Sequence, residues 1–285
     1  MKEASSILFQ EYYHEKTGEI EKTLDSFIEP QNEELKDILN YSLKNGKRFR
    51  PTLCVLVSDI FGGDKEEALN NAAIVEFIHS SSLIHDDVID NDKVRRAMPS
   101  LWKKLEGENI QKDAKNLAIL LGDGMLSTAT RINKNARVIE ASADALNELA
   151  RGSLKEAYGE DKDEESYLEV IRLKTGSLFG LATELGSIAA KTSEEQTRKC
   201  KEAGIELGII YQLADDYADG EARMDKKKIE KLIKTHCKRF VEKTESMPEN
   251  NYTEMFESVP VYLVNKMFEE RGMTLKLKEG FEWEK

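Results

Sequence analysis

The stretch LIHDDVID, residues 83–90, ends an apolar segment in a cluster of aspartates, and the stretch QLADDYAD, residues 212–219, ends another in the same way. Each contains the pattern DDxxD. In an α-helix, residues four apart share a face, so the first and last aspartate of each pattern would project together. These carboxylates repel one another, and they lie at helix C-termini, where the helix dipole favours cations. The two stretches therefore predict two helix ends that each need a positive partner.

A hard divalent cation meets that need. Magnesium prefers oxygen ligands, keeps several waters, and typically uses one or two carboxylates together with substrate phosphates. A single DDxxD in an acidic protein is more often a solvated helix end, so the prediction of a metal site rests on the repetition of the pattern. The pairs expected to face the metal are Asp86 with Asp90, and Asp215 with Asp219.

Long helices are expected around both clusters, because none of the five prolines lies between Pro99 and Pro248. The intervening segments are rich in good helix formers, and apolar residues recur at helical spacing. Strand-like alternation is scarce, and no glycine-rich phosphate loop is present. The sequence therefore predicts an all-α protein folded as one domain over residues 1–285. About ten helices are expected, at roughly 3–25, 32–45, 51–61, 65–90, 113–131, 137–158, 163–190, 194–219, 224–246 and 252–269.

The composition excludes several classes of protein. A net charge of -12 argues against a general nucleic-acid binder, although a small phosphorylated substrate needs only a local basic cluster. No apolar run approaches the ~20 residues of a transmembrane helix, and the N-terminus lacks the features of a signal peptide. The three cysteines form no CxxC pair, so we expect free thiols in a reducing cytoplasm.

Basic residues that could bind a diphosphate are found near both clusters. The segment GKRFRP, residues 46–51, places three positive charges before a predicted helix start marked by proline, and arginine and lysine both suit phosphate. Taken singly, each candidate has a plainer explanation: a solvated loop for GKRFRP, a structural role for His79, and surface charge for Arg95 and Arg96. The same holds for Lys174, whose default location is a helix surface.

Six segments resemble, in the same order, the trans-isoprenyl diphosphate synthases, which include farnesyl, geranylgeranyl and longer polyprenyl diphosphate synthases. They are GKRFRP at 46–51, FIHSSSLIHDDVIDND at 77–92, RRAMPS at 95–100, GDGMLSTA at 122–129, KTGSLFG at 174–180 and YQLADDYAD at 211–219. The resemblance covers residues 46–219, and the paired DDxxD motifs are its most specific part.

This resemblance implies an all-α isoprenoid synthase fold with a deep central pocket, usually in a homodimer. It implies a catalyst that joins isopentenyl diphosphate to an allylic diphosphate (dimethylallyl, geranyl or farnesyl). Magnesium, about two or three ions with manganese as an alternative, would be held by Asp86, Asp87, Asp90, Asp215 and Asp219, with Asp216 in support. The allylic diphosphate would contact Arg95, Lys174 and Thr175. Isopentenyl diphosphate would contact Lys47, Arg50, His79 and Arg96, and Gln212 matches a polar position beside the second cluster.

The implied chemistry needs no nucleophilic serine or cysteine. Metal and cations would stabilise the departing diphosphate, and the isopentenyl double bond would attack the allylic cation in a dry apolar pocket. The small residues Ser81 and Ser82 would let the product pass, with Phe77 as a floor. We therefore expect a C20 product, with longer chains as the alternative, and a shorter product after Ser81→Phe.

The sequence departs from the family pattern at three places. Asn45 and Ala97 stand where glycine is usual. After Asp219 the family continues with a glycine-lysine loop that closes over the site, whereas this chain reads GEARMDKKK at 220–228. Lys226–Lys228 either replace the usual lysine or form an exposed helix start, which leaves lid closure open.

Two other functions were weighed against the synthase. A class I terpene cyclase also ionises allylic diphosphates, but it usually carries an Asn/Ser/Glu-type second motif and needs no isopentenyl pocket. A non-catalytic or regulatory subunit of a synthase would explain the altered segment after Asp219. Retention of both aspartate sets and of the basic residues argues against that subunit.

Overall fold

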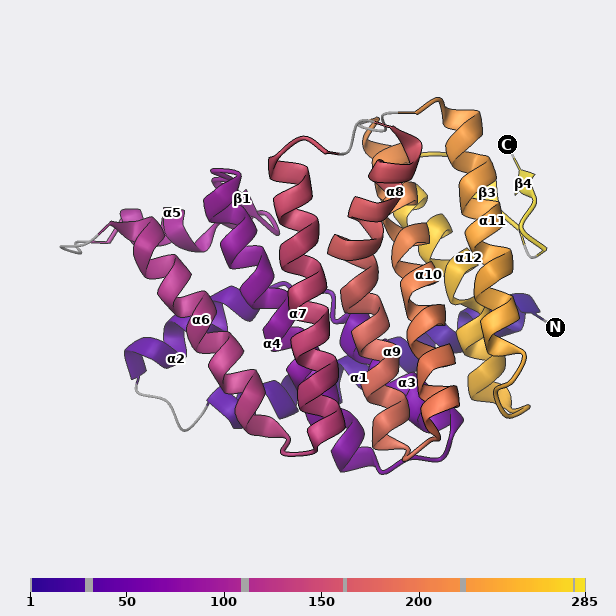
Figure 1. The fold of residues 1–285 in the computed structure, drawn as a ribbon, viewed down its shortest axis with the longest axis horizontal. Helices are drawn as coiled ribbons and strands as arrows, with labels where there is room; N and C mark the ends of the chain where they lie inside the picture. The colour runs from indigo at the N-terminus through magenta and orange to yellow at the C-terminus, as the bar shows by residue number, and fades with distance from the viewer. Residues whose placement is uncertain are drawn as a thin grey trace.

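The computed structural model describes residues 2–28, 33–108, 113–160, 163–220, 224–278 and 280–284, and long helices dominate it (Figure 1). The α-helices are α1 (Lys2–Ile28), α2 (Glu33–Leu43), α3 (Phe49–Ile60), α4 (Lys65–Ile89), α5 (Leu101–Glu106), α6 (Ala114–Ile132), α7 (Ala136–Ala157), α8 (Glu164–Ile171), α9 (Ser177–Ala189), α10 (Glu194–Asp219), α11 (Lys226–Thr244) and α12 (Asn251–Glu270). The only strands in the described residues form two short antiparallel hairpins, β1 (Val94–Arg95) with β2 (Met98–Pro99), and β3 (Lys276–Leu277) with β4 (Trp283–Glu284).

The predicted all-α class is confirmed, and most predicted helices agree with the structure to within a few residues. The prediction was wrong in joining residues 163–190 into one helix. The structure inserts a π-helical turn, η1 (Arg172–Gly176), between α8 and α9. The short helix α5 and the two hairpins were not predicted, since six-residue and two-residue elements leave little periodic signal. The expected helix start at residue 32 lies outside the described residues.

Helix α9 forms the centre of the core. It packs against α3, α4, α7 and α10, and nearly all of its residues are buried. Two glycines allow close approach. A Cβ at Gly186 would lie 2.2 Å from the carbonyl oxygen of Cys54 on α3, and one at Gly204 on α10 would lie 2.4 Å from that of Phe179. These helices therefore pack with their backbones in close approach.

Both acid clusters lie at helix C-termini, as predicted. Helix α4 ends at Ile89 with Asp90 as its cap, and α10 ends at Asp219, followed by Gly220 in the left-handed conformation at φ 73°. In Figure 1 both helices run upward, so the two ends lie on the same side of the molecule, near the β1 hairpin and α8. No helix in the described part of the chain is long and apolar enough to cross a membrane. Cys54, Cys200 and Cys237 are buried free thiols.

Candidate functional site

A cavity of about 750 Å³ lies between these helix ends, and we call it the central cavity. Its walls come from α1, α3, α4, α7, η1, α9, α10 and α12, together with the segment before α3 and the β1 hairpin. The predicted site residues on its walls are Lys47, Arg50, His79, Asp86, Arg95, Arg96, Lys174, Thr175, Gln212 and Asp215. Residues from positions 47 to 215 therefore meet around one volume, and α12 adds residues that the sequence analysis did not single out.

The aspartates of the first cluster point in different directions. Asp86 lines the central cavity, and burial raises the pKa of its carboxyl, as does neighbouring Asp90, while Lys174 opposes the rise. Asp87 is only 3% exposed and is not among the cavity residues; it accepts a 2.7 Å hydrogen bond from Nε of Arg95. Asp86 therefore faces the cavity, whereas Asp87 has a protein partner.

The second cluster repeats this division. Asp215 lines the cavity, whereas Asp216 accepts a 2.8 Å hydrogen bond from Nε2 of Gln212 and another from the hydroxyl of Tyr167. Gln212 also accepts a 2.8 Å hydrogen bond from Oγ1 of Thr175 on η1. The middle aspartate of each DDxxD is therefore held by protein partners, and the supporting role of Asp216 that the resemblance implies stays a prediction.

Arg271, which follows the last residue of α12, was missed by the sequence analysis. Its Nη2 lies 2.6 Å from Oδ1 of Asp215, and its Nε lies 2.5 Å from Oδ1 of Asp219. Burial raises the pKa of Asp215 although the charge of Arg271 opposes this rise. The hydrogen bond from Arg271 lowers the pKa of Asp219. A lone arginine after the last helix carries no motif, so only the fold could reveal this contact.

The π-helical turn presents Lys174 to the first cluster. Lys174 pairs with Glu156 on α7 and lies close enough to Asp86 to affect its charge. Burial would lower the pKa of the Lys174 ammonium, but Glu156 and Asp86 together raise it, so the lysine stays positive. Single π-turns within helices often occur at functional sites because they re-aim side chains.

A basic pocket occupies the side of the cavity near α3. Arg50 lies 4.5 Å from the ring centre of Phe179, and its Nη1 is 3.2 Å from Nε2 of His79. Burial, followed by the charge of Arg50, lowers the pKa of His79 well below 6.5, so the imidazole is neutral and Nε2 accepts from Arg50. Nε of Arg50 and Nδ1 of His79 are buried without a hydrogen-bond partner among the described residues. Lys47, at the rim, pairs with Glu270 at 2.7 Å.

The carboxylate oxygens of the two clusters fit a hard divalent cation. No three histidine, cysteine, aspartate or glutamate side chains in the described residues converge as a closed metal cage. Magnesium takes few protein ligands and completes its shell with water and phosphate oxygens. The residues that could hold it are Asp86 and Asp90 at one helix end, and Asp215 and Asp219 at the other; of these four, Asp86 and Asp215 line the cavity. The guanidinium of Arg271 forms ion pairs with both Asp215 and Asp219.

Of the three residues expected to control product length, the structure places one at the cavity and two away from it. Ser82 lines the central cavity, but Ser81 and Phe77 do not. Ser81 is fully buried, and its hydroxyl donates a 2.9 Å hydrogen bond to the carbonyl oxygen of Gly122 on α6. Of the altered segment at 220–228, residues 221–223 lie outside the described residues. Lys226–Lys228 form the exposed first turn of α11, where Lys228 pairs with Glu164.

Comparison with known proteins gives a consistent result. Residues 32–239 match the family model described as polyprenyl synthetase. The chain is 28% identical to a hexaprenyl pyrophosphate synthase from Saccharolobus solfataricus, over 92% of this chain and 98% of the relative. It is 34% identical to a nonaprenyl diphosphate synthase from Mycobacterium tuberculosis, over 72% of this chain but only 61% of that relative.

A solved structure shows the same fold. A geranyltransferase from Legionella pneumophila superimposes with a TM-score of 0.78 at 24% identity, covering 93% of this chain and 99% of that chain. At this level of identity the likeness concerns the fold alone, and it agrees with the observed arrangement of helices.

Proposed function

The chain belongs to the polyprenyl synthetase family, and from this we propose that it is a trans-prenyltransferase that joins isopentenyl diphosphate to an allylic diphosphate. The observation that carries the proposal is the shared cavity. Asp86 and Asp215, the first aspartate of each cluster, line one cavity together with the basic residues Arg50, His79 and Arg96. A hydrolase or a binding module would not need two separate sets of groups for phosphate at this spacing.

Each set of residues has a distinct task. Asp86, Asp90, Asp215 and Asp219 would hold magnesium, which when bound would supply the positive charge that favours departure of diphosphate. Lys174 and Arg95 line the cavity and would hold the oxygens of the allylic diphosphate. Arg50, Arg96 and His79 would hold isopentenyl diphosphate, and among the described residues Nε of Arg50 and Nδ1 of His79 have no hydrogen-bond partner.

The apolar wall of the cavity suits a short-lived cation. Leu83, Leu149, Leu178, Phe179 and Leu263 line it and would exclude water from the allylic centre. Aromatic faces can also stabilise positive charge, and Phe179 and Tyr211 already lie beside the guanidinium of Arg50. The chain's own contribution is to bind two diphosphates, align the two reacting carbons and keep water out.

A C20 product, a requirement for magnesium and a homodimer remain parts of this proposal. The relatives named above make products of different lengths, so product length requires measurement. For the dimer, α6 packs on α4 and α5 and exposes Leu120 by 65%, while α7 exposes Leu154 by 56%. Helices α6 and α7 follow one another in the chain, and a contiguous exposed apolar surface is typical of an association site.

The test is a prenyl-transfer assay with the purified full chain. Magnesium, labelled isopentenyl diphosphate and, separately, dimethylallyl, geranyl and farnesyl diphosphate are incubated, and product length is read after dephosphorylation. Metal-dependent elongation that ends at one length is the expected result. If folded protein extends no primer, the proposal is wrong, and the alternatives are a partner subunit or a cyclase. Light scattering on the same sample gives the oligomeric state.

A further inference from the structure

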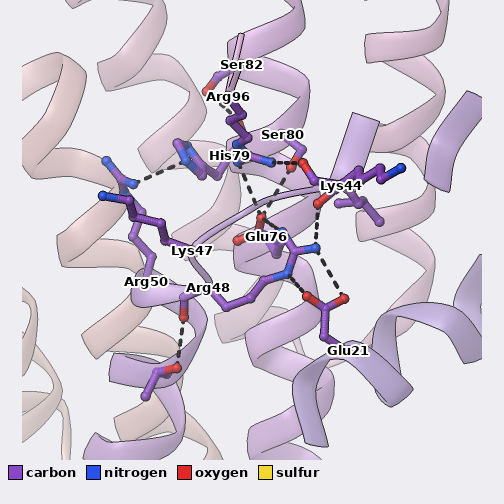
Figure 2. A network of polar contacts seen from close by, with 12 residues as sticks. Glu21, Lys44, Lys47, Arg48, Arg50, Glu76, His79, Ser80, Ser82 and Arg96 are labelled. Carbon is purple, nitrogen blue, oxygen red and sulfur yellow. Dashed lines mark hydrogen bonds and ion pairs between the residues drawn. The ribbon is translucent and has the colours of Figure 1, made fainter. Parts of the chain in front are cut away.

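Four charged side chains from four separate segments form a continuous chain behind the basic pocket. They are Glu21 on α1, Arg48 before α3, Glu76 on α4 and Arg96 in the β1 hairpin turn (Figure 2). Arg48 and Glu76 are almost completely buried, with each side chain 2% exposed. Buried charges persist only when they are paired, so this arrangement is costly and calls for a physical reason.

Every donor group of Arg48 is already in use. Its Nε donates a 2.8 Å hydrogen bond to Oε1 of Glu21, and its Nη1 donates a 2.6 Å hydrogen bond to Oε1 of Glu76. Its Nη2 donates a 2.6 Å hydrogen bond to the carbonyl oxygen of Leu43. Glu76 and then Glu21 raise its pKa, although burial opposes them. Arg48 borders the cavity, but every nitrogen of its guanidinium already donates to a protein acceptor. These hydrogen bonds tie Arg48 to Glu21, Glu76 and the backbone at Leu43.

The carboxylate of Glu76 is shared unequally between two arginines. Its Oε1 is 2.6 Å from Nη1 of Arg48 but 3.8 Å from Nη2 of Arg96, and Oγ of Ser80 lies 3.4 Å away. The other contact of the Arg96 guanidinium is long, 3.5 Å from Nη1 to the carbonyl oxygen of Lys44. Arg96 thus lines the cavity as a cation with no anionic partner closer than 3.8 Å among the described residues, and the buried carboxylate of Glu76 at that distance could become one.

We propose that Arg48 is a positioning residue that acts through Glu76. Arg48 forms a 2.6 Å ion pair with Glu76, and this pair keeps the carboxylate from forming a close ion pair with Arg96. The guanidinium of Arg96 therefore stays available to bind the diphosphate of isopentenyl diphosphate. Glu21 completes the arrangement by holding Arg48 from the opposite side. The inference rests on the proposed function, and it assigns the central cation of GKRFRP a role different from that of its neighbours Lys47 and Arg50.

Removal of Arg48 has a definite consequence. The buried carboxylate of Glu76 would lose its main partner, and the nearest cation left is Arg96. A closed Glu76–Arg96 pair would remove one cation from the basic pocket, and charge-assisted contacts to phosphate are among the stronger ones. Removal of Glu76 in addition would free Arg96 again, so the second substitution should repair the first.

The experiment compares Arg48→Met, Glu76→Gln and the double variant with the wild type. KM for isopentenyl diphosphate, KM for the allylic primer and kcat are measured, together with the thermal midpoint. Arg48→Met should raise KM for isopentenyl diphosphate at least about tenfold and leave KM for the primer within about twofold. The double variant should return to within about threefold of wild type, and Glu76→Gln alone should not raise KM. Arg137→Met is the control, because Arg137 is a partly buried arginine that bonds Thr192 and Thr197 away from the cavity.

Three results would overturn the inference. These are an unchanged KM for isopentenyl diphosphate in folded Arg48→Met, an equal rise in both KM values, and a double variant no better than the single one. If Arg48→Met does not fold, Arg48→Lys keeps the buried charge but supplies a single point of contact, and the same selective rise is expected. Titration of each variant with inorganic pyrophosphate in EDTA measures the affinity of the basic pocket for a diphosphate in the absence of metal and of catalysis. Wild type that binds pyrophosphate without elongating primers refutes the function alone, whereas active wild type with unaffected Arg48→Met refutes the positioning role alone.

Discussion

Arg271 donates two hydrogen bonds to Asp219, from Nε at 2.5 Å and from Nη2 at 3.1 Å, although the two residues are 52 positions apart. The same Nη2 also reaches Asp215 at 2.6 Å. The end of α12 therefore supplies a fixed cation to the pair of carboxylates that the sequence assigns to metal. A divalent ion that binds there must share or displace this guanidinium.

Arg271→Gln should bind metal more tightly than wild type. The substitution removes a positive charge that both repels the ion and engages its ligands, so we expect about three- to tenfold higher affinity at low salt. Manganese titration followed by electron paramagnetic resonance measures this without substrate. Lys266→Gln is the control, since Lys266 lies on the same helix and lines the cavity but pairs with Glu269 instead. Equal affinities for wild type and Arg271→Gln would show that the guanidinium does not compete.

Asp86→Asn should mainly weaken metal binding, whereas Asp87→Asn should mainly lower the stability of the fold. Asp86 faces the cavity, so its amide variant should lose at least about 100-fold in turnover and bind manganese more weakly. Asp87 is paired with Arg95, so Asp87→Asn should lower the free energy of unfolding by about 1–3 kcal/mol with a smaller effect on metal affinity. Denaturant unfolding and the manganese titration distinguish the two. Equal loss of metal affinity in both variants would mean that Asp87 is a direct ligand.

His79 should make stability fall on acidification. Its pKa in the folded protein lies well below 6.5, because of burial first and then the charges of Arg50 and Arg96. Below pH 6.5 the unfolded chain takes up a proton that the folded chain excludes. Stability is therefore complete above pH 6.5 and is lost as the pH falls toward the folded pKa, by up to about 1.4 kcal/mol per pH unit. Urea unfolding of wild type and His79→Gln from pH 7 to pH 5 should give a shallower slope for the variant; identical slopes would contradict the assignment.

Ser82→Phe should shorten the product, whereas Ser81→Phe should mainly destabilise the protein. Ser82 borders the central cavity, so a phenyl ring there can reduce the space for a growing chain. Ser81 is packed on Gly122, where an added ring overpacks the contact between α4 and α6 at a cost of about 1–3 kcal/mol. Product length by chromatography and thermal midpoints are measured for both. A shorter product from Ser81→Phe with an unchanged midpoint would restore the original expectation.

Local sequence was sufficient for most helices and for the location of both acid clusters. The spacing of Asp86 and Asp90 within four residues puts them at one helix end, whatever the rest of the chain does. The same reasoning could not separate the middle aspartates from the outer ones. Arg95 and Tyr167 approach Asp87 and Asp216 from other segments, and which carboxylate they bind depends on how those segments pack.

The sequence by itself determined the helical class, the two DDxxD ends and the order of the basic motifs, because these depend on periodicity and on contacts within a few residues. Tertiary structure alone decided that Arg271 sits on the second cluster, that Glu76 is shared by Arg48 and Arg96, and that Ser81 turns from the cavity toward Gly122. The physical reason is that a buried charge or hydroxyl needs a partner, and the packed helices supply that partner from residues that are distant in the sequence. The spacing of residues along the chain does not predict which residues these are.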